Sequence, residues 1–320
     1  MLLSSLLFFA GLLILYFGAE GLVQGASSLA LQYGIPPVVV GLTVVALGTS
    51  MPEFLVNFFA VFADESSLAL GNIIGSNISN VALILGSCAL VLPLTVTPEI
   101  LQREYPVMFG VMVLFYVCAL DGVIGTADGL VMVLLLFGLG GFLFYETHQT
   151  DTAAMLEQVE GELEDADPTM SGWAKFGYVF GGMAGLALGA HLMVDSAVTI
   201  AQRLGIATGI IGLTAVALGT SLPELAASMV SAAKSESDLS VGNVMGSNVL
   251  NVLFVVGLIS IVQPLEVEPR SLRIDFPVML GFCGLLLPLT WTNYRISRVG
   301  GTLLLVSFFG YMTFLMLPYL

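Results

Sequence analysis

Charged residues are scarce in this chain. Only 10% of its 320 residues are Asp, Glu, Lys or Arg, whereas 57% are hydrophobic and the mean hydropathy is +1.00. A soluble domain carries about 25% charged residues. The composition therefore excludes an ordinary water-soluble domain and indicates an α-helical protein that crosses a membrane many times.

Cysteine is rare as well. The three cysteines, Cys88, Cys118 and Cys283, all lie in apolar segments, which favours small buried hydrophobes over a disulfide framework. The first apolar segment has no basic leader and continues past the length of a signal core. We therefore expect it to be a transmembrane span and not a cleavable signal peptide.

Ten apolar segments are long enough to cross a bilayer, which takes about 17–25 residues in a helix. They cover residues 2–31, 37–62, 68–92, 105–120, 127–145, 174–201, 209–233, 239–262, 276–292 and 300–317. The first and the sixth are so long that they require strong tilt, or an end outside the hydrocarbon. We predict ten transmembrane helices.

A hydrophilic segment separates the first five spans from the last five. Eight acidic residues lie between Glu146 and Asp167, which predicts a solvated linker without the ligand spacing of an EF-hand. We expect a first repeat over 1–145, a linker over 146–173 and a second repeat over 174–320. The distribution of basic residues, five on one side and three on the other, favours both termini outside.

The two halves carry the same motifs 171 residues apart. Gly-Thr-Ser-Met-Pro-Glu at 48–53 returns as Gly-Thr-Ser-Leu-Pro-Glu at 219–224, and the Gly-Asn-x-x-Gly-Ser-Asn motif at 71–77 returns at 242–248. Five spans per repeat place the second copy in the bilayer with the opposite orientation. The sequence predicts an all-α membrane protein of two inverted five-helix repeats, which is typical of transporters that bind substrate at the midplane between the halves.

Each hexapeptide places a carboxylate next to a proline inside an apolar helix. An acidic residue at the centre of a transmembrane helix costs about 2.5–3.5 kcal/mol, so Glu53 and Glu224 are expected to face a partner or an ion pathway. The proline before each glutamate lacks an N–H and so frees the carbonyl four residues back, at Gly48 and Gly219. Carboxylate, hydroxyl and carbonyl oxygens together are typical ligands of a hard cation.

Neutral oxygen-bearing side chains accompany both glutamates. In the third predicted span, Ser76 and Asn80 lie one turn apart. With the residues that the repeat adds, the polar set is Thr49, Ser50, Ser76, Asn77, Asn80, Thr220, Ser221, Ser247, Asn248 and Asn251. Two carboxylates within such a set suit Ca²⁺ or Na⁺. The alternative role of these side chains is hydrogen bonding between helices, above all for the asparagine that ends each Gly-Asn motif.

The paired motifs resemble the two α-repeats of the sodium/calcium exchanger (cation/calcium antiporter) family. The ten-span layout resembles that of its prokaryotic members over nearly the whole chain. This resemblance implies that Glu53 and Glu224 are the central cation carboxylates. It implies further oxygen ligands at Ser50, Ser221, Thr49, Thr220, Asn80, Asn251, Ser76, Ser247, Ala46 and Ala217. The carbonyls of the two alanines would lie toward a flanking site for a monovalent cation.

Two positions depart from the family pattern. Many sodium/calcium exchangers carry an acid at one of the positions that Asn80 and Asn251 occupy, so the expected site here holds only two formal negative charges. This leaves the exchange ratio open. His191 stands where the repeat aligns it with Glu20, and a histidine there either confers proton sensitivity or makes a hydrogen bond between helices.

We predict an antiporter that exchanges Ca²⁺ for Na⁺ by alternating access, with both ions as substrates and no resident cofactor. A Ca²⁺/H⁺ antiporter is the nearest alternative, since protons can also neutralise two carboxylates, and a passive cation channel is a weaker one. The chain has no Gly-x-Ser-x-Gly or His-Glu-x-x-His motif, so we expect no enzyme. The expected setting is a prokaryotic inner membrane, with lipid around the protein and no nucleic-acid partner.

Overall fold

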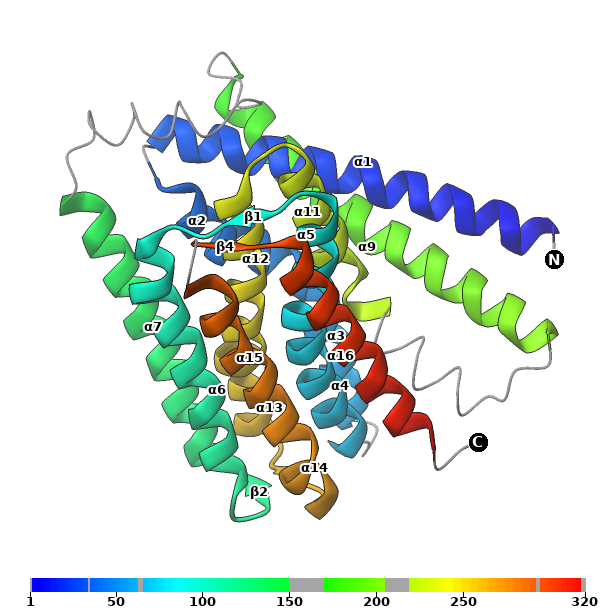
Figure 1. The fold of residues 1–320 in the computed structure, drawn as a ribbon, viewed down its shortest axis with the longest axis vertical. Coiled ribbons are helices and arrows are strands. Elements are labelled where there is room, and N and C mark those ends of the chain that lie inside the picture. Colours follow the sequence, from blue (N-terminus) through cyan, green and yellow to red (C-terminus); the bar gives the residue numbers. More distant parts are fainter. Residues whose placement is uncertain are drawn as a thin grey trace.

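The computed structural model describes residues 2–33, 35–62, 66–149, 170–204, 219–291 and 294–317, and nearly all of its elements are helices (Figure 1). Within this part, nine helical segments are long and apolar enough to cross a membrane. They match nine of the ten predicted spans. The seventh predicted span is described only from Gly219 onward. The chain is therefore a multi-pass, all-α membrane protein, as predicted.

The first half begins with two long helical stretches. In the element names that follow, η denotes a π-helical segment. Its elements are α1 (Leu2–Tyr33), α2 (Pro37–Val40), η1 (Gly41–Val45), α3 (Ala46–Phe62), α4 (Ser66–Ser79), η2 (Asn80–Ile84), α5 (Leu85–Val91), β1 (Leu94–Thr95), η3 (Ile100–Glu104), α6 (Tyr105–Ala119), β2 (Val123–Ile124) and α7 (Thr126–Gln149). In lipid every backbone polar group needs a partner within the protein, which is why apolar segments form helices.

The second half repeats this order. Its described elements are α9 (Gly172–Arg203), α11 (Leu222–Ala233), α12 (Ser237–Leu250), η4 (Asn251–Val256), α13 (Gly257–Val262), β3 (Leu265–Glu266), α14 (Pro269–Arg273), α15 (Asp275–Trp291), β4 (Arg295–Ile296) and α16 (Arg298–Met316). Helix α7 continues four residues past the predicted end of its span, because no glycine or proline interrupts residues 142–149.

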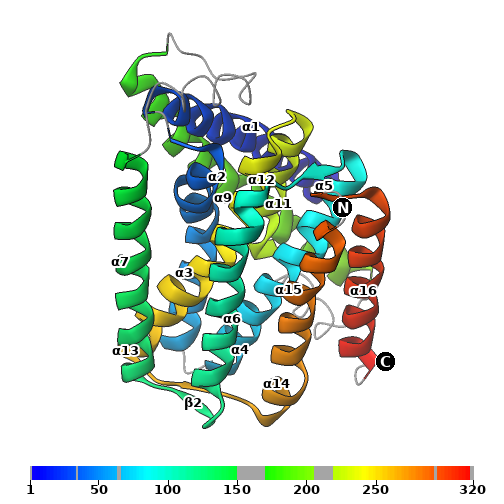
Figure 2. The same ribbon diagram turned by 60° about the vertical axis from the view of Figure 1, so that its left-hand side comes forward.

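Helices α1 and α9 run antiparallel with their backbones in contact. A Cβ at Gly18 would lie 2.6 Å from the backbone nitrogen of Leu186, and one at Gly182 would lie 2.4 Å from that of Leu22. Glycine at these positions is what permits so close an approach. Figures 1 and 2 show α1 steeply inclined to α6 and α7, as expected for a span of this length.

Two short strand pairs join the halves and reveal their opposite orientation. Strand β1 pairs with β4, and β2 pairs with β3, so each pair takes one strand from each half. In Figure 1 the β1–β4 pair lies near the top and β2 near the bottom. Since β1 and β3 occupy equivalent places in the two repeats, their location at opposite ends is what inverted repeats require.

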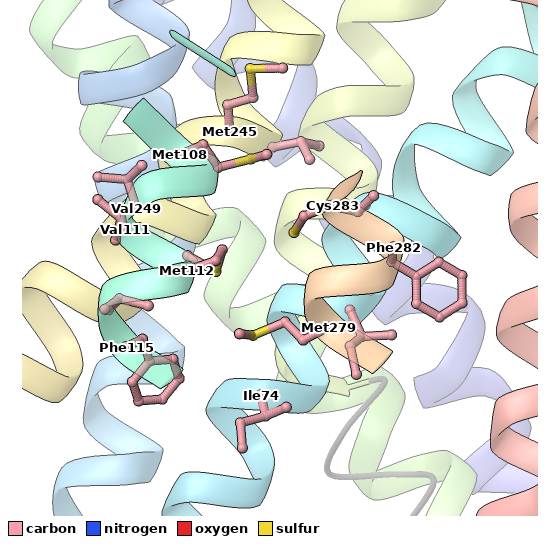
Figure 3. Packing of buried hydrophobic residues seen from close by; sticks show 14 of the residues in the cluster. Ile74, Met108, Val111, Met112, Phe115, Met245, Val249, Met279, Phe282 and Cys283 are labelled. Atoms are coloured by element: carbon pink, nitrogen blue, oxygen red, sulfur yellow. The ribbon is translucent and has the colours of Figure 1, made fainter. Parts of the chain in front are cut away.

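The third and eighth spans form the centre of the molecule. Every residue of α12 from Leu239 to Leu250 is buried. Figure 3 shows α6 and α15 against these central helices, with Met108 and Met112 of α6 and Met279 of α15 in the space between them. Of these central helices, α4 contacts the motif helix α3, and α12 contacts both α3 and α11.

Candidate cation site between the repeats

The two glutamates lie on helices from opposite repeats. Glu53 is 1% exposed and sits in α3, directly after Pro52, which lies inside that helix. Glu224 is 0% exposed and sits in the first turn of α11. Ser221 precedes α11 with φ −89° and ψ 2°, which lies in the sparsely populated bridge region often found at active sites. Both carboxylates are thus held in the interior, Glu53 next to a proline within a helix and Glu224 just after a break in helical geometry.

Serine hydroxyls connect the carboxylates across the repeats. Ser76 donates to Glu53 Oε1 over 2.5 Å, and Ser221 donates to the same oxygen over 3.4 Å. In the other direction, Ser50 donates to Glu224 Oε1 over 3.0 Å. Each glutamate therefore accepts a hydrogen bond from the serine in the opposite hexapeptide. The two motifs meet at one place, as the inverted repeat predicts.

Two asparagine pairs cross the same boundary. Asn80 Nδ2 donates to Asn248 Oδ1 over 3.0 Å, and Asn251 Nδ2 donates to Asn77 Oδ1 over 3.4 Å. These bonds fix the amide nitrogens of Asn80 and Asn251 and leave the Oδ1 atom of each without a hydrogen-bond partner. Asn77 and Asn248 thus make hydrogen bonds between helices, and the oxygens of Asn80 and Asn251 remain available.

Five oxygens of the expected ligand set are buried without a hydrogen-bond partner. They are Oε2 of Glu53, Oε2 of Glu224, Oδ1 of Asn80, Oδ1 of Asn251 and Oγ of Ser247. Leaving a buried polar atom unpaired costs about 1–3 kcal/mol, and more for a carboxylate. Oxygen coordination to a hard cation removes this cost, and the donor set of carboxylates, amides and hydroxyls fits such an ion.

Comparison with known proteins assigns the chain to a family. The sequence profile described as sodium/calcium exchanger protein matches residues 3–145 and 174–317. The chain belongs to the sodium/calcium exchanger family. This protein is therefore a membrane antiporter and not an enzyme.

Relatives of this exchanger are similar over nearly their whole length. The sodium/calcium exchanger MaX1 of Methanosarcina acetivorans is 30% identical over 98% of both chains. Inner membrane protein YrbG of Escherichia coli K12 is 36% identical, over 88% of this chain and 86% of YrbG. The structure of the sodium-calcium exchanger NCX_Mj soaked with Na⁺ and Ca²⁺ has a TM-score of 0.80 to this one, with 28% identity over 98% of both chains.

The remaining expected ligands of this exchanger are placed as follows. Thr49 and Thr220 are buried, and the Ala46 carbonyl accepts a hydrogen bond from the Thr49 hydroxyl over 3.3 Å. Ala217 lies outside the described residues. Among the residues that the structure describes, no three His, Cys, Asp or Glu side chains gather as a metal cluster, so the candidate site has two carboxylates and otherwise neutral oxygens.

His191 does not bridge two helices. Its Nε2 lies 3.4 Å from Oδ2 of Asp195, one turn later in α9, and both side chains are about two thirds exposed. The expected alternative of a hydrogen bond between helices is therefore wrong for this residue. The reason is geometric, since positions i and i+4 of one helix are neighbours on its surface.

Four buried polar residues near the site had no role in the sequence analysis. They are Asn57, Asn72, Ser228 and Asn243, and their hydrogen bonds go to Thr49, to Thr220 or to one another. The 171-residue spacing contained a signal for them. Asn72 and Asn243 are the second residues of the two Gly-Asn motifs, and Asn57 aligns with Ser228.

Proposed function

We propose that this exchanger moves Ca²⁺ against Na⁺ by alternating access. The observation that carries the proposal is the meeting of Glu53 and Glu224, each with one buried oxygen that has no partner, beside the free amide oxygens of Asn80 and Asn251. The two carboxylates neutralise one Ca²⁺ or two Na⁺. The proposed ligands are those expected from the sequence, Ala217 included, and the ions are cargo with no resident cofactor beside them.

Charge balance gives a reason for coupled transport. With an ion bound, the site is close to neutral, and the apolar surfaces of the moving helices can slide past it. Without an ion, two buried carboxylates repel one another and lack compensation, which disfavours the same movement. The glycine-rich contact holds α1 and α9 together as one pair of helices, and this pair can slide past the rest of the protein as a unit.

A Ca²⁺/H⁺ antiporter is the second candidate. It is favoured by the amides at Asn80 and Asn251, since the site has no third carboxylate that would balance an additional Na⁺. Two protons on Glu53 and Glu224 would neutralise the site as well as two Na⁺ do. Membership of an antiporter family speaks against a passive channel.

The proposed setting is the inner membrane of a prokaryotic cell, with both termini outside. The relative YrbG is an inner membrane protein, which supports the location, and the unequal distribution of basic residues supports the orientation. We also propose that residues 1–145 and 174–320 act as the two moving halves, with residues 146–173 as the linker between them.

A flux assay separates the candidates. Purified protein is reconstituted into liposomes, and ⁴⁵Ca²⁺ uptake is measured with an outward Na⁺ gradient, with a pH gradient in the absence of Na⁺, and with neither gradient. Liposomes that contain Glu224→Gln serve as the control. We expect uptake only with the Na⁺ gradient. Uptake driven by the pH gradient alone would favour Ca²⁺/H⁺ exchange, and uptake with neither gradient would indicate a channel.

A further inference from the structure

A chain of buried hydrogen bonds reaches the first hexapeptide from the second repeat. Asn243 Nδ2, on α12, donates to Ser228 Oγ over 2.8 Å and to the Glu224 backbone carbonyl over 3.4 Å, both on α11. Asn243 Oδ1 accepts the Thr49 hydroxyl of α3 over 3.3 Å. A carbonyl can only accept, so the amide nitrogen of Asn243 must face α11 and its oxygen must face Thr49.

The mirror chain reaches the second hexapeptide from the first repeat. Asn72 Nδ2, on α4, donates to Asn57 Oδ1 on α3 over 3.0 Å. Asn72 Oδ1 accepts the Thr220 hydroxyl over 3.3 Å. Each asparagine is thus tied to the motif helix of its own repeat and holds the threonine of the opposite repeat.

The hydrogen bond to Asn243 determines which acceptor receives the proton of the Thr49 hydroxyl. Thr49 Oγ1 lies 3.3 Å from Asn243 Oδ1 and also 3.3 Å from the Ala46 carbonyl oxygen. A hydroxyl has one proton to donate. When Asn243 accepts that proton, the Ala46 carbonyl keeps its lone pairs for another partner. Without Asn243, the hydroxyl loses that acceptor, and the Ala46 carbonyl at 3.3 Å remains to accept its proton.

We propose that Asn243 and Asn72 are positioning residues, each of which holds the threonine of the opposite hexapeptide, and that Asn243 thereby leaves the Ala46 carbonyl available to a transported cation. All of the side chains in these two series of hydrogen bonds are buried, so their hydrogen bonds are not exchanged for water. The inference rests on the proposed function in one respect, namely that Ala46 contributes to a flanking Na⁺ site.

The inference predicts a specific change in ion affinity. Asn243→Ala should raise the Na⁺ concentration for half-maximal exchange by about threefold to tenfold, the factor expected for one buried hydrogen bond. A general packing defect would instead lower the maximal rate for both ions and leave half-saturation unchanged. Asn243→Leu keeps most of the side-chain volume and replaces the alanine variant if the cavity prevents insertion.

A double-mutant cycle tests the route through Thr49. Na⁺ half-saturation is measured for Asn243→Ala, Thr49→Val and the combination. Because valine has no hydroxyl to occupy the Ala46 carbonyl, the effect of Asn243→Ala should largely disappear in the Thr49→Val background. The matched control combines Asn243→Ala with Thr220→Val, since Thr220 bonds to Asn72 and not to Asn243. There the two fold-changes in Na⁺ half-saturation should simply multiply.

The outcomes are distinct. Suppression by Thr49→Val with independence from Thr220→Val supports the proposal. Independent effects in both cycles, or equal coupling in both, would overturn it, as would a fall in maximal rate with unchanged half-saturation. If the unmutated protein shows no Na⁺ dependence at all, the proposed Na⁺/Ca²⁺ exchange fails instead, and the assay reports this before any variant is compared.

Discussion

The two hexapeptides differ at one residue in sequence and yet adopt different backbones. In the first, α3 continues without interruption from Ala46 to Phe62, straight through Pro52. In the second, the chain leaves helical geometry at Ser221 and α11 begins one residue later. Local sequence therefore does not decide where the helix breaks. The surroundings of each motif decide it, and alternating access by inverted repeats would make these surroundings differ in any one state.

The hydrogen bonds of the two repeats show the same asymmetry. Ser76 donates to Glu53 over 2.5 Å, whereas Ser247, at the equivalent position, is buried without a partner. The reciprocal pair of Ser221 with Glu53 and Ser50 with Glu224 is retained. The centre of the site is thus symmetric and its edges are not. Alternating access by inverted repeats predicts that the edges exchange their roles in the opposite state.

The largest effect is expected where the repeats are equivalent. Glu53→Gln and Glu224→Gln should each reduce Ca²⁺ exchange more than about a hundredfold, because each removes half of the negative charge that compensates the ion. The check is ⁴⁵Ca²⁺ flux in liposomes, with size-exclusion chromatography to establish that both variants are folded. Substantial flux through either variant would contradict the shared role of the two carboxylates.

An intermediate effect is expected from added charge. Asn251→Asp should lower the Ca²⁺ concentration for half-maximal binding by about tenfold at pH 9, and by less at pH 6, because protonation removes the added charge. Asn80→Asp, the equivalent change in the other repeat, is the matched comparison. Ca²⁺ binding measured between pH 6 and 9 checks both. Curves that coincide with those of the unmutated protein would place Asn251 outside the ligand shell.

The smallest effect concerns the edges of the site. Without bound ions, Ser76→Ala should lower the free energy of unfolding by about 1.5–3 kcal/mol, the contribution of a hydrogen bond to a charged group. Ser247→Ala should cost less, since its hydroxyl has no partner to lose. Thermal unfolding of the two variants in detergent, with chelator present, compares them. Equal destabilisation of the two variants would contradict the difference in hydrogen bonding between Ser76 and Ser247.

Much of the fold could be predicted from the sequence. Apolar segment length gave the spans, and the constant spacing of the motifs, together with the odd number of spans per repeat, gave the inverted arrangement. The cross-pairing of β1 with β4 could not be predicted, since two-residue strands have no pattern of their own. The π-helical turns that begin at Asn80 and Asn251 were also missed, because no residue pattern marks a π turn.

The candidate site was predicted in its composition and not in its internal connections. The motifs identified the carboxylates and their neighbours, as the contacts of Glu53 and Glu224 with Ser50, Ser76 and Ser221 illustrate. The sequence does not say which asparagine supplies a free oxygen and which one orients its neighbour. That division depends on where helices from distant parts of the chain cross. It became visible only in the hydrogen bonds.

Accessibility of cysteines placed along α1 and α9 tests alternating access most directly. In a background without Cys88, Cys118 and Cys283, single cysteines on each half of these helices are labelled with a membrane-impermeant thiol reagent, under ion gradients that favour one state or the other. We expect positions on the external half to lose reactivity when the inward-facing state is favoured, and positions on the internal half to gain it. Reactivity that stays constant on both sides during active exchange would contradict the account.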